Sequence, residues 1–154
     1  MKYALIIGAS GNGKSTTINE VCKRLKPSKV WELNSEEIFV EVEMTVGIFN
    51  GTYLIEVNNT IILVAAGSPT EQDITITVLV EIAINLGFDI KILIVAMRTF
   101  EKKEDFDTPN ELNKLGVKIF QEKISKIPGD FKKSTEWNDR VDNIVSKVKE
   151  NLLR

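Results

Sequence analysis

The sequence predicts an α/β protein in which helices cover both faces of an open, mostly parallel sheet of about five strands, with a β-hairpin inserted. Short apolar runs of strand length alternate with segments of helical periodicity. Two of those runs, Thr60–Ala66 and Ile90–Met97, are apolar almost throughout, as expected of central parallel strands. The 154 residues suit one domain with one sizeable core, spanning residues 1–154.

The chain opens with a strand, a helix and a second strand. Lys2–Ile7 is a short apolar run, and Ser15–Leu25 carries apolar residues on one helical face. After a break at Lys26-Pro27-Ser28, Val30–Leu33 reads as a short strand. This order predicts the first strand and helix of an α/β unit.

A β-hairpin is predicted next. Ile38–Val46 alternates apolar and polar residues, and Thr52–Val57 reads as the return strand. Asn50-Gly51 between them is a strong short-range hairpin signal. The hairpin offers a strand edge to a protein partner or to a second copy of the chain, or it simply extends the sheet.

The middle of the chain predicts a tight turn at Asn58-Asn59 and a helix after the Thr60–Ala66 strand. That helix begins with Thr70 as its cap, carries Asp73 at its third helical position and ends at Leu86 before Gly87.

The last third of the chain predicts two more helices. Thr108-Pro109 reads as a cap followed by the first helical position, and that helix ends near Gly116. Val117–Gln121 is then a last strand or a continuation of the helix. Apolar residues at helical spacing from Trp137 to Leu152 predict a long amphipathic helix.

A glycine-rich segment links the first strand to the first helix and reads Gly8-Ala9-Ser10-Gly11-Asn12-Gly13-Lys14-Ser15. Its pattern, G-x-x-x-x-G-K-[ST], is typical of a phosphate-binding loop. Glycines lack Cβ, so the backbone can curl with its N–H groups toward a common centre, and the N-terminus of the following helix adds a partial positive charge. Gly8, Gly11 and Gly13 fit this need, so the segment predicts a polyphosphate site.

Each polar residue of the segment has an expected task. Lys14 would bridge the β- and γ-phosphates, the Ser15 hydroxyl would hold Mg²⁺, and Thr16 lies where it could reach the α-phosphate. With Ser10 and Asn12 in the loop, these residues complete the predicted nucleotide-binding set. The segment resembles the Walker A element of the P-loop NTPase superfamily. That resemblance implies a three-layer P-loop fold, a nucleoside triphosphate and Mg²⁺.

A phosphoryl-transfer site also needs an acid at a strand end to orient the metal or the attacking water. The strand Ile61–Ala66 contains none, and Val64 stands where the superfamily usually has Asp. The first acids after it are Glu71 and Asp73, with Gln72 between them as a group that could orient water. Glu71 and Asp73 are therefore catalytic candidates, and capping of the following helix explains them equally well.

Arg98 follows the Ile90–Met97 strand at its carboxyl end. An arginine there could neutralise γ-phosphate charge in the transition state or stack on a base. The alternative is an exposed loop arginine that pairs with Glu101 or Asp105.

Three further resemblances bear on the activity. The order of elements over residues 1–100 is similar to that of small GTPases, but Val95-Ala96-Met97-Arg98 stands in place of the guanine-recognising Asn-Lys-x-Asp. The P-loop end resembles small nucleoside and nucleotide kinases, although no arginine-paired lid segment occurs. Gly67-Ser68-Pro69 followed by Ala96-Met97-Arg98-Thr99 is similar to small, uncharacterised bacterial and phage P-loop ATP-binding proteins.

Composition excludes several other classes. A formal net charge of −2 gives no strong signal for nucleic acid or an anionic membrane. The absence of histidine removes His-based triads and most zinc sites, and Cys22 has no partner for a disulfide. No apolar run approaches the roughly 20 residues of a membrane span, and no signal peptide is evident, so we expect a cytoplasmic protein.

The sequence therefore predicts Mg²⁺-dependent ATP binding with hydrolysis or γ-phosphoryl transfer. In this hypothesis Lys14 stabilises phosphate charge, Arg98 assists the transition state, and Glu71 or Asp73 positions water or metal. Two alternatives stay open. One is a non-catalytic, regulatory nucleotide-binding module, which the missing strand acid favours. The other is a kinase that phosphorylates a nucleoside, a nucleotide or another small acceptor.

Overall fold

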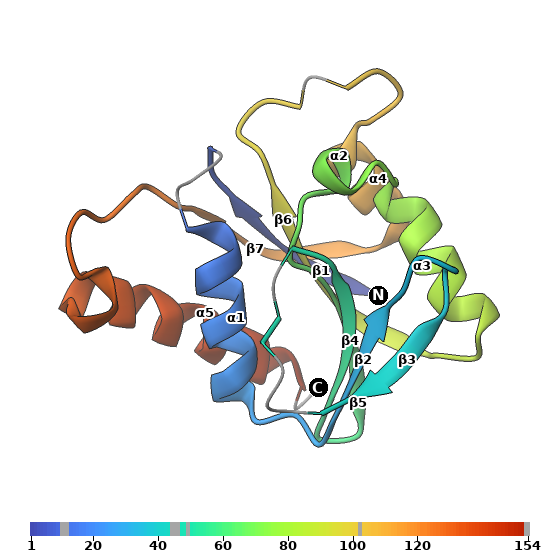
Figure 1. The fold of residues 1–154 in the computed structure, drawn as a ribbon, viewed down its shortest axis with the longest axis horizontal. Helices are drawn as coiled ribbons and strands as arrows, with labels where there is room; N and C mark the ends of the chain where they lie inside the picture. Colours follow the sequence, from blue (N-terminus) through green and yellow to red (C-terminus); the bar gives the residue numbers. More distant parts are fainter. Residues whose placement is uncertain (10–12, 44–46, 49, 102, 153–154) are drawn as a thin grey trace.

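One mixed β-sheet of seven strands organises the described part of the chain, which comprises residues 1–9, 13–43, 47–48, 50–101 and 103–152. In this computed structural model the strand order is β3-β2-β4-β5-β6-β1-β7 (Figure 1). The strands are β1 (Lys2–Ile7), β2 (Lys29–Leu33), β3 (Phe39–Val42), β4 (Thr52–Val57), β5 (Thr60–Ala65), β6 (Ile90–Met97) and β7 (Val117–Lys123). The helices of the described residues are α1 (Lys14–Leu25), α2 (Pro69–Gln72), α3 (Ile76–Asn85), α4 (Thr108–Leu115) and α5 (Thr135–Leu152), with a 3₁₀ turn η1 (Phe131–Lys133).

The parallel half of the sheet consists of β5, β6, β1 and β7. β1 lies between β6 and β7 and pairs in parallel with both, and β5 pairs in parallel with β6. The side chains of β5 and β6 are largely buried, as their apolar sequences predict. The α/β class is thus confirmed, and the alternative that Val117–Gln121 continues a helix is wrong because β7 is a strand.

The antiparallel half differs from the sequence prediction, because the hairpin expected across Asn50-Gly51 is not formed. Instead β3 pairs with β2, and β4 pairs with both β2 and β5. The side chain of Asn34 accepts hydrogen bonds from the backbone N–H groups of Glu36 (2.9 Å) and Ile38 (3.1 Å), which closes the turn between β2 and β3. Residues 44–46 of the predicted strand lie outside the described residues.

The expected number of strands was also too low. β4 and β5 are joined by the predicted tight turn at Asn58-Asn59, where both residues have positive φ (50° and 61°). The antiparallel strands therefore continue the parallel strands in one sheet, which gives seven strands rather than about five.

The helix predicted over Thr70–Leu86 is in fact two helices, α2 and α3. Asp73 between them adopts a left-handed conformation with φ 58°, which an aspartate tolerates better than most residues. Thr75, rather than Thr70, caps the longer helix α3 by accepting a hydrogen bond from the N–H of Val78. The predicted end of α3 before Gly87 (φ 96°) is confirmed. A similar shift affects α4, which Asp107 rather than Thr108 caps.

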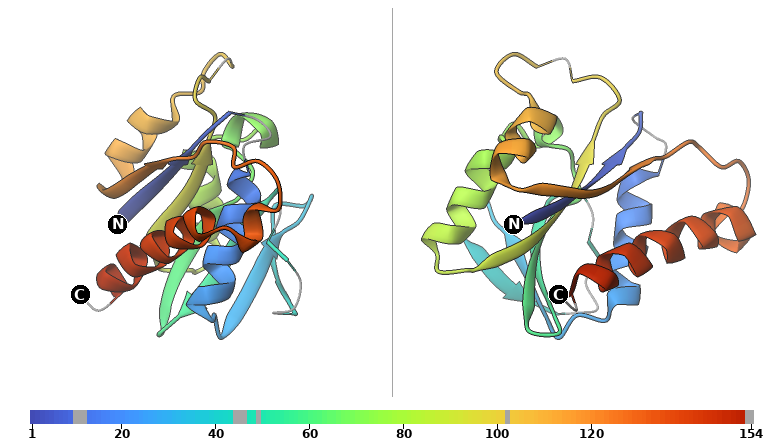
Figure 2. Two further views of the ribbon diagram at one scale, coloured as in Figure 1. Left: turned by 90° about the vertical axis from the view of Figure 1, so that its left-hand side faces the viewer. Right: turned by 180° about the vertical axis from the view of Figure 1, so that it is seen from behind.

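Helices lie on both faces of the sheet (Figure 2). α1 and α5 pack with one set of strand side chains, and α3 and α4 pack with the side chains that point to the opposite face. This alternation follows from the period of two along each strand, which is visible in Leu5 on one face and Ile6 on the other.

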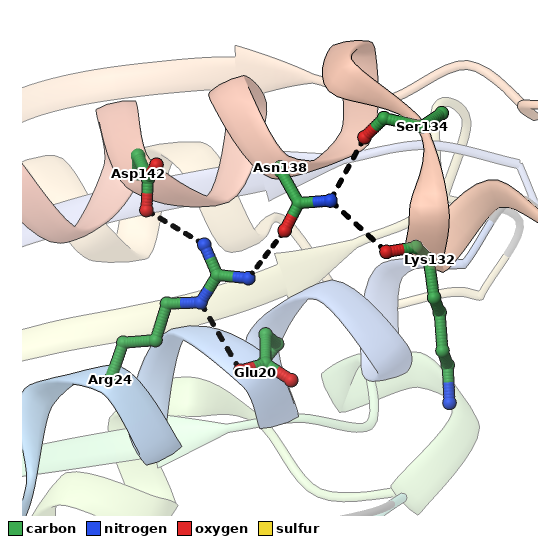
Figure 3. A network of polar contacts seen from close by, with 6 residues as sticks. All are labelled: Glu20, Arg24, Lys132, Ser134, Asn138 and Asp142. Carbon is green, nitrogen blue, oxygen red and sulfur yellow. Dashed lines mark hydrogen bonds and ion pairs between the residues drawn. The ribbon is translucent and has the colours of Figure 1, made fainter.

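A polar network joins α1 to α5 (Figure 3). The guanidinium of Arg24 donates to three acceptors: Glu20 Oε2 (3.2 Å), Asp142 Oδ1 (2.7 Å) and Asn138 Oδ1 (2.7 Å). The amide of Asn138 in turn donates to the main-chain oxygens of Lys132 (3.0 Å) and Ser134 (2.9 Å). One arginine therefore fixes α1, α5 and the segment before α5 relative to one another.

Within the described residues, no helix combines the length and the apolar character needed to cross a membrane.

The single cysteine is part of the core in this fold. Burial raises the pKa of Cys22 to about 12, so almost no thiolate exists at pH 8. We expect Cys22 to resist Ellman's reagent in the native protein and to react fully in guanidinium chloride. Rapid reaction of the native protein would contradict the packing of α1 against the sheet.

Candidate functional site

A hollow lies at the carboxyl edge of the parallel strands, where β1, β5 and β6 end. The chain leaves β1 toward α1 on one face and leaves β6 toward α4 on the other, so these neighbouring strands form a switch point of the kind that binds ligands. The hollow has a volume of about 320 Å³. It is lined by Gly13, Lys14, Ser15, Thr16, Asn50, Ala66 and Glu71.

The first turn of α1 forms the floor of this hollow. Gly13 caps the helix in a left-handed conformation with φ 85°, which favours glycine, and its carbonyl accepts from the N–H of Thr17 (2.9 Å). No described side chain caps this end of the helix. The predicted loop residues Ser10, Gly11 and Asn12 lie outside the described residues.

Gly8 serves a purpose that the sequence pattern does not reveal. Its N–H donates to the carbonyl oxygen of Met97 (3.1 Å), which ties the end of β1 to the end of β6. A Cβ on Gly8 would lie only 2.9 Å from the carbonyl oxygen of Ile124, a main-chain atom that cannot easily move. Gly8 therefore allows the segment after β7 to pass close to the end of β1.

Lys14 is nearly buried, with a relative exposure of 7%. Its ammonium donates to the carbonyl oxygens of Gly8 (2.8 Å) and Ala9 (3.2 Å). Burial lowers the pKa of Lys14, the charge of Glu71 raises it and that of Arg98 lowers it, and the net shift is downward. An ammonium has three N–H donors, and the described residues accept from two of them.

Ser15 reaches the other wall of the hollow. Its Oγ lies 3.2 Å from Asn50 Oδ1 and 3.2 Å from the carbonyl oxygen of Ala66, which directly follows β5. A phosphoryl-transfer site calls for a carboxylate at the end of this strand. Ser15 instead lies beside a main-chain oxygen and a side-chain amide.

Asn50 is a candidate-site residue that the sequence does not indicate, because Asn50-Gly51 predicts a hairpin turn instead. It has φ 48°, and the neighbouring Gly51 accepts hydrogen bonds from the N–H groups of Ala66 (2.8 Å) and Gly67 (3.2 Å). The sequence signal that could have placed Asn50 at the site is the tight turn at Asn58-Asn59. An antiparallel pair joined there brings the start of β4 beside the end of β5.

Glu71 and Arg98, predicted separately, form an ion pair with 3.0 Å between Oε1 and Nε. Arg98 therefore pairs with neither Glu101 nor Asp105 in this structure. Partial burial raises the pKa of Glu71, but the hydrogen bond from Arg98 and the charges of Arg98 and Lys14 lower it by more. The net pKa lies below the ordinary value, so the carboxylate is ionised at neutral pH.

Two further candidates point elsewhere. Asp73 forms an ion pair with Lys103 and does not line the hollow. Gln72 donates to the carbonyl oxygen of Gly67 and accepts from the hydroxyl of Thr52 (2.9 Å), so its amide is engaged in holding the loop after β5. Of Glu71 and Asp73, only Glu71 lines the hollow together with residues 13–16.

The described residues contain no group of three or more Cys, Asp or Glu side chains that could hold a metal ion. Comparison with models of protein families, with curated proteins and with solved structures finds no match for this chain.

The Glu71–Arg98 pair makes a prediction about acid–base behaviour. Arg98→Ala removes a hydrogen bond and a positive charge while leaving the partial burial of Glu71, so the pKa of Glu71 should rise. Carbon-detected NMR titration of the Glu71 carboxylate measures this shift, and Lys103→Ala, at the neighbouring ion pair with Asp73, is the control.

The lowered pKa of Glu71 in the native protein also affects the stability of the fold. Because the pKa of Glu71 is depressed in the folded state, its ionised form stabilises the fold above the unfolded pKa, and this contribution disappears as the pH falls through the folded pKa. An unchanged titration of Glu71 in Arg98→Ala would contradict the assigned pairing.

Proposed function

We propose that this protein binds ATP together with Mg²⁺, and that it hydrolyses ATP or transfers its γ-phosphoryl group. The observation that carries the proposal is the convergence of the α1 N-terminus, Lys14 and Ser15 on one hollow, with the Glu71–Arg98 pair beside it. We also propose that the fold is a three-layer P-loop NTPase fold. Two observations support this: a strand, a glycine-rich segment and a helix follow one another in the chain, and helices cover both faces of the sheet.

The charges and donors of the hollow suit a polyphosphate. The first turn of α1 supplies unpaired N–H groups and a partial charge of about +0.5. Lys14 adds a full positive charge, and no described residue engages its third N–H group or the other four N–H groups of Arg98. Glu71 is the single negative charge among the lining residues.

The oxygen donors also fit Mg²⁺, which prefers hard oxygen ligands and keeps several waters. Ser15 Oγ would hold the ion, with Asn50 Oδ1 and the carbonyl oxygen of Ala66 each 3.2 Å from that atom. When bound, the ion would neutralise charge on the phosphates.

Each side chain then has a role in the reaction. Lys14 binds the β- and γ-phosphate oxygens, and Arg98 stabilises the charge that develops as the γ-phosphoryl group leaves. Glu71 is ionised and can accept a hydrogen bond from the attacking water or acceptor hydroxyl, which orients that nucleophile.

The alternative is a nucleotide-binding module without turnover, and one observation favours it. β5 (Thr60–Ala65) contains no acid, and the residue that follows it presents only a main-chain oxygen to Ser15. In this reading Glu71 serves to hold Arg98, and the output is a conformational change rather than a product.

Lys14→Ala tests binding. Isothermal titration with ATP, ADP and GTP, each with Mg²⁺, should give millimolar or tighter binding of at least one nucleotide by the native protein. Loss of a charge-assisted hydrogen bond should weaken that binding by about 10- to 100-fold. Lys23→Ala, an exposed lysine on the same helix, is the matched control and should bind normally. Failure of every nucleotide to bind the native protein would end the proposal.

Glu71→Gln separates the catalytic reading from the module. Removal of a negative charge beside the phosphates should leave ATP binding equal or tighter, whereas loss of the orienting carboxylate should slow phosphate release by about 10²-fold or more. Asp73→Asn is the control, since Asp73 pairs with Lys103. Phosphate release that is absent from the native protein would favour the module. Release that is present and equal in Glu71→Gln would overturn the catalytic role assigned to Glu71.

A further inference from the structure

A second cavity, with a volume of about 180 Å³, shares Gly13 with the first as a lining residue. It lies between α1, the segment that follows β7 and the start of α5. Its apolar walls come from Ile127, Phe131 and Trp137, and Arg140 lies at the same cavity. The rings of Phe131 and Trp137 meet edge to face with 5.6 Å between their centroids.

The cavity contains an unsatisfied polar group. Thr17 lines it from α1 with no solvent exposure, and its Oγ1 has no hydrogen-bond partner among the described residues. A buried hydroxyl without a partner costs free energy, so such atoms are uncommon in native structures. A ligand in this cavity that donates or accepts one hydrogen bond would remove that cost.

The size and the walls of the cavity favour one ring system. Sites for drug-sized molecules have volumes of about 300 to 1,000 Å³, and this cavity is smaller. Aromatic walls are suited to a planar aromatic ligand, which can contact their faces and edges. A heteroaromatic ring also carries the polar edge that the Thr17 hydroxyl needs.

The position of the cavity connects it to the phosphate hollow. Gly13 lines both, and Thr17 follows Ser15 and Thr16 by less than one helical turn. A molecule with a polyphosphate over the first turn of α1 would therefore extend past Gly13 toward Phe131 and Trp137.

The walls of this cavity are held in place by the Arg24 network (Figure 3). Asn138 and Ser134 fix the segment that carries Phe131, where the Ser134 hydroxyl donates to the Phe131 carbonyl oxygen (2.7 Å). The same hydroxyl accepts from the N–H of Trp137 (3.1 Å). The cavity is thus preorganised, which reduces the ordering cost of binding.

We propose that this cavity binds the nucleobase of the nucleotide, with the Thr17 hydroxyl hydrogen-bonded to a polar atom on the edge of the base and with Phe131 and Trp137 against its ring. This inference rests on the proposed function, because it needs a triphosphate on α1. It assigns Thr17, Phe131 and Trp137 to recognition of the base, and Lys14 and Ser15 to the phosphates.

The experiment compares ATP with inorganic tripolyphosphate, which lacks the base, both with Mg²⁺. It uses the Trp31→Phe variant, so that Trp137 is the only tryptophan that reports by fluorescence. Trp31 packs with the cluster on the other face of the sheet, and phenylalanine preserves its aromatic contact with Phe88. ATP should bind at least about ten-fold more tightly than tripolyphosphate and should change the Trp137 emission.

Two substitutions then test the residues. Thr17→Val preserves shape and should weaken ATP binding about five-fold, and Phe131→Ala should also weaken it, while tripolyphosphate binding is unchanged in both. Thr60→Val is the control, since Thr60 lies at the opposite end of β5. Circular dichroism establishes that each variant is folded.

The outcomes separate the two proposals. Equal affinity for ATP and tripolyphosphate, or ATP binding that neither substitution weakens, would overturn the base site and leave the phosphate site standing. If neither ligand binds, the proposed function fails and the base site fails with it. Weaker tripolyphosphate binding by Thr17→Val would assign Thr17 to the phosphates and would also overturn the inference.

Discussion

The open N-terminus of α1 is the constraint on which the rest of the structure depends. A helix begins with N–H groups that have no partner inside the helix, and Gly13 provides no side chain to cap them. In the fold this end of α1 lies at the carboxyl edge of the sheet, where β1, β5 and β6 end side by side. An anion would accept hydrogen bonds from these N–H groups and would be attracted by the partial positive charge at the N-terminus of the helix. This surface is therefore suited to a group such as phosphate.

Close approaches between backbone segments give the site its walls. The carbonyl of Ile124 passes so near Gly8 that a side chain there would collide with it, and the main chain of Asn50 is 3.1 to 3.4 Å from the Cβ position of Gly67. The second contact joins the antiparallel half of the sheet to the parallel half. For this reason β4 is part of the candidate site, since Asn50, two residues before the strand, brings a polar side chain to Ser15.

The local features of this fold are readable from the sequence. β1, α1 and β6 follow from apolar runs of strand length and from one apolar helical face. Strand pairing is harder to predict, because the Asn50-Gly51 signal is local while the choice of neighbour depends on competition among distant strands. The turn at Asn34 pairs β3 with β2 instead of β4. The left-handed conformation of Asp73 separates α2 from α3. The pairing of Arg98 with Glu71, 27 positions apart, is a property of the assembled strand ends and is not encoded in either neighbourhood.

The most direct test of the account is the response of the α1 backbone to a polyphosphate. In a ¹⁵N-labelled sample, titration with tripolyphosphate and Mg²⁺ should give the largest amide shifts at Lys14, Ser15 and Thr16, since their N–H groups begin the helix. In the Lys14→Ala variant the same shifts should need about 10- to 100-fold more ligand, while the amide signals of the free variant far from residue 14 keep their native positions. Saturating ligand that leaves these three amides unmoved, or that shifts only amides far from this edge of the sheet, would contradict the account.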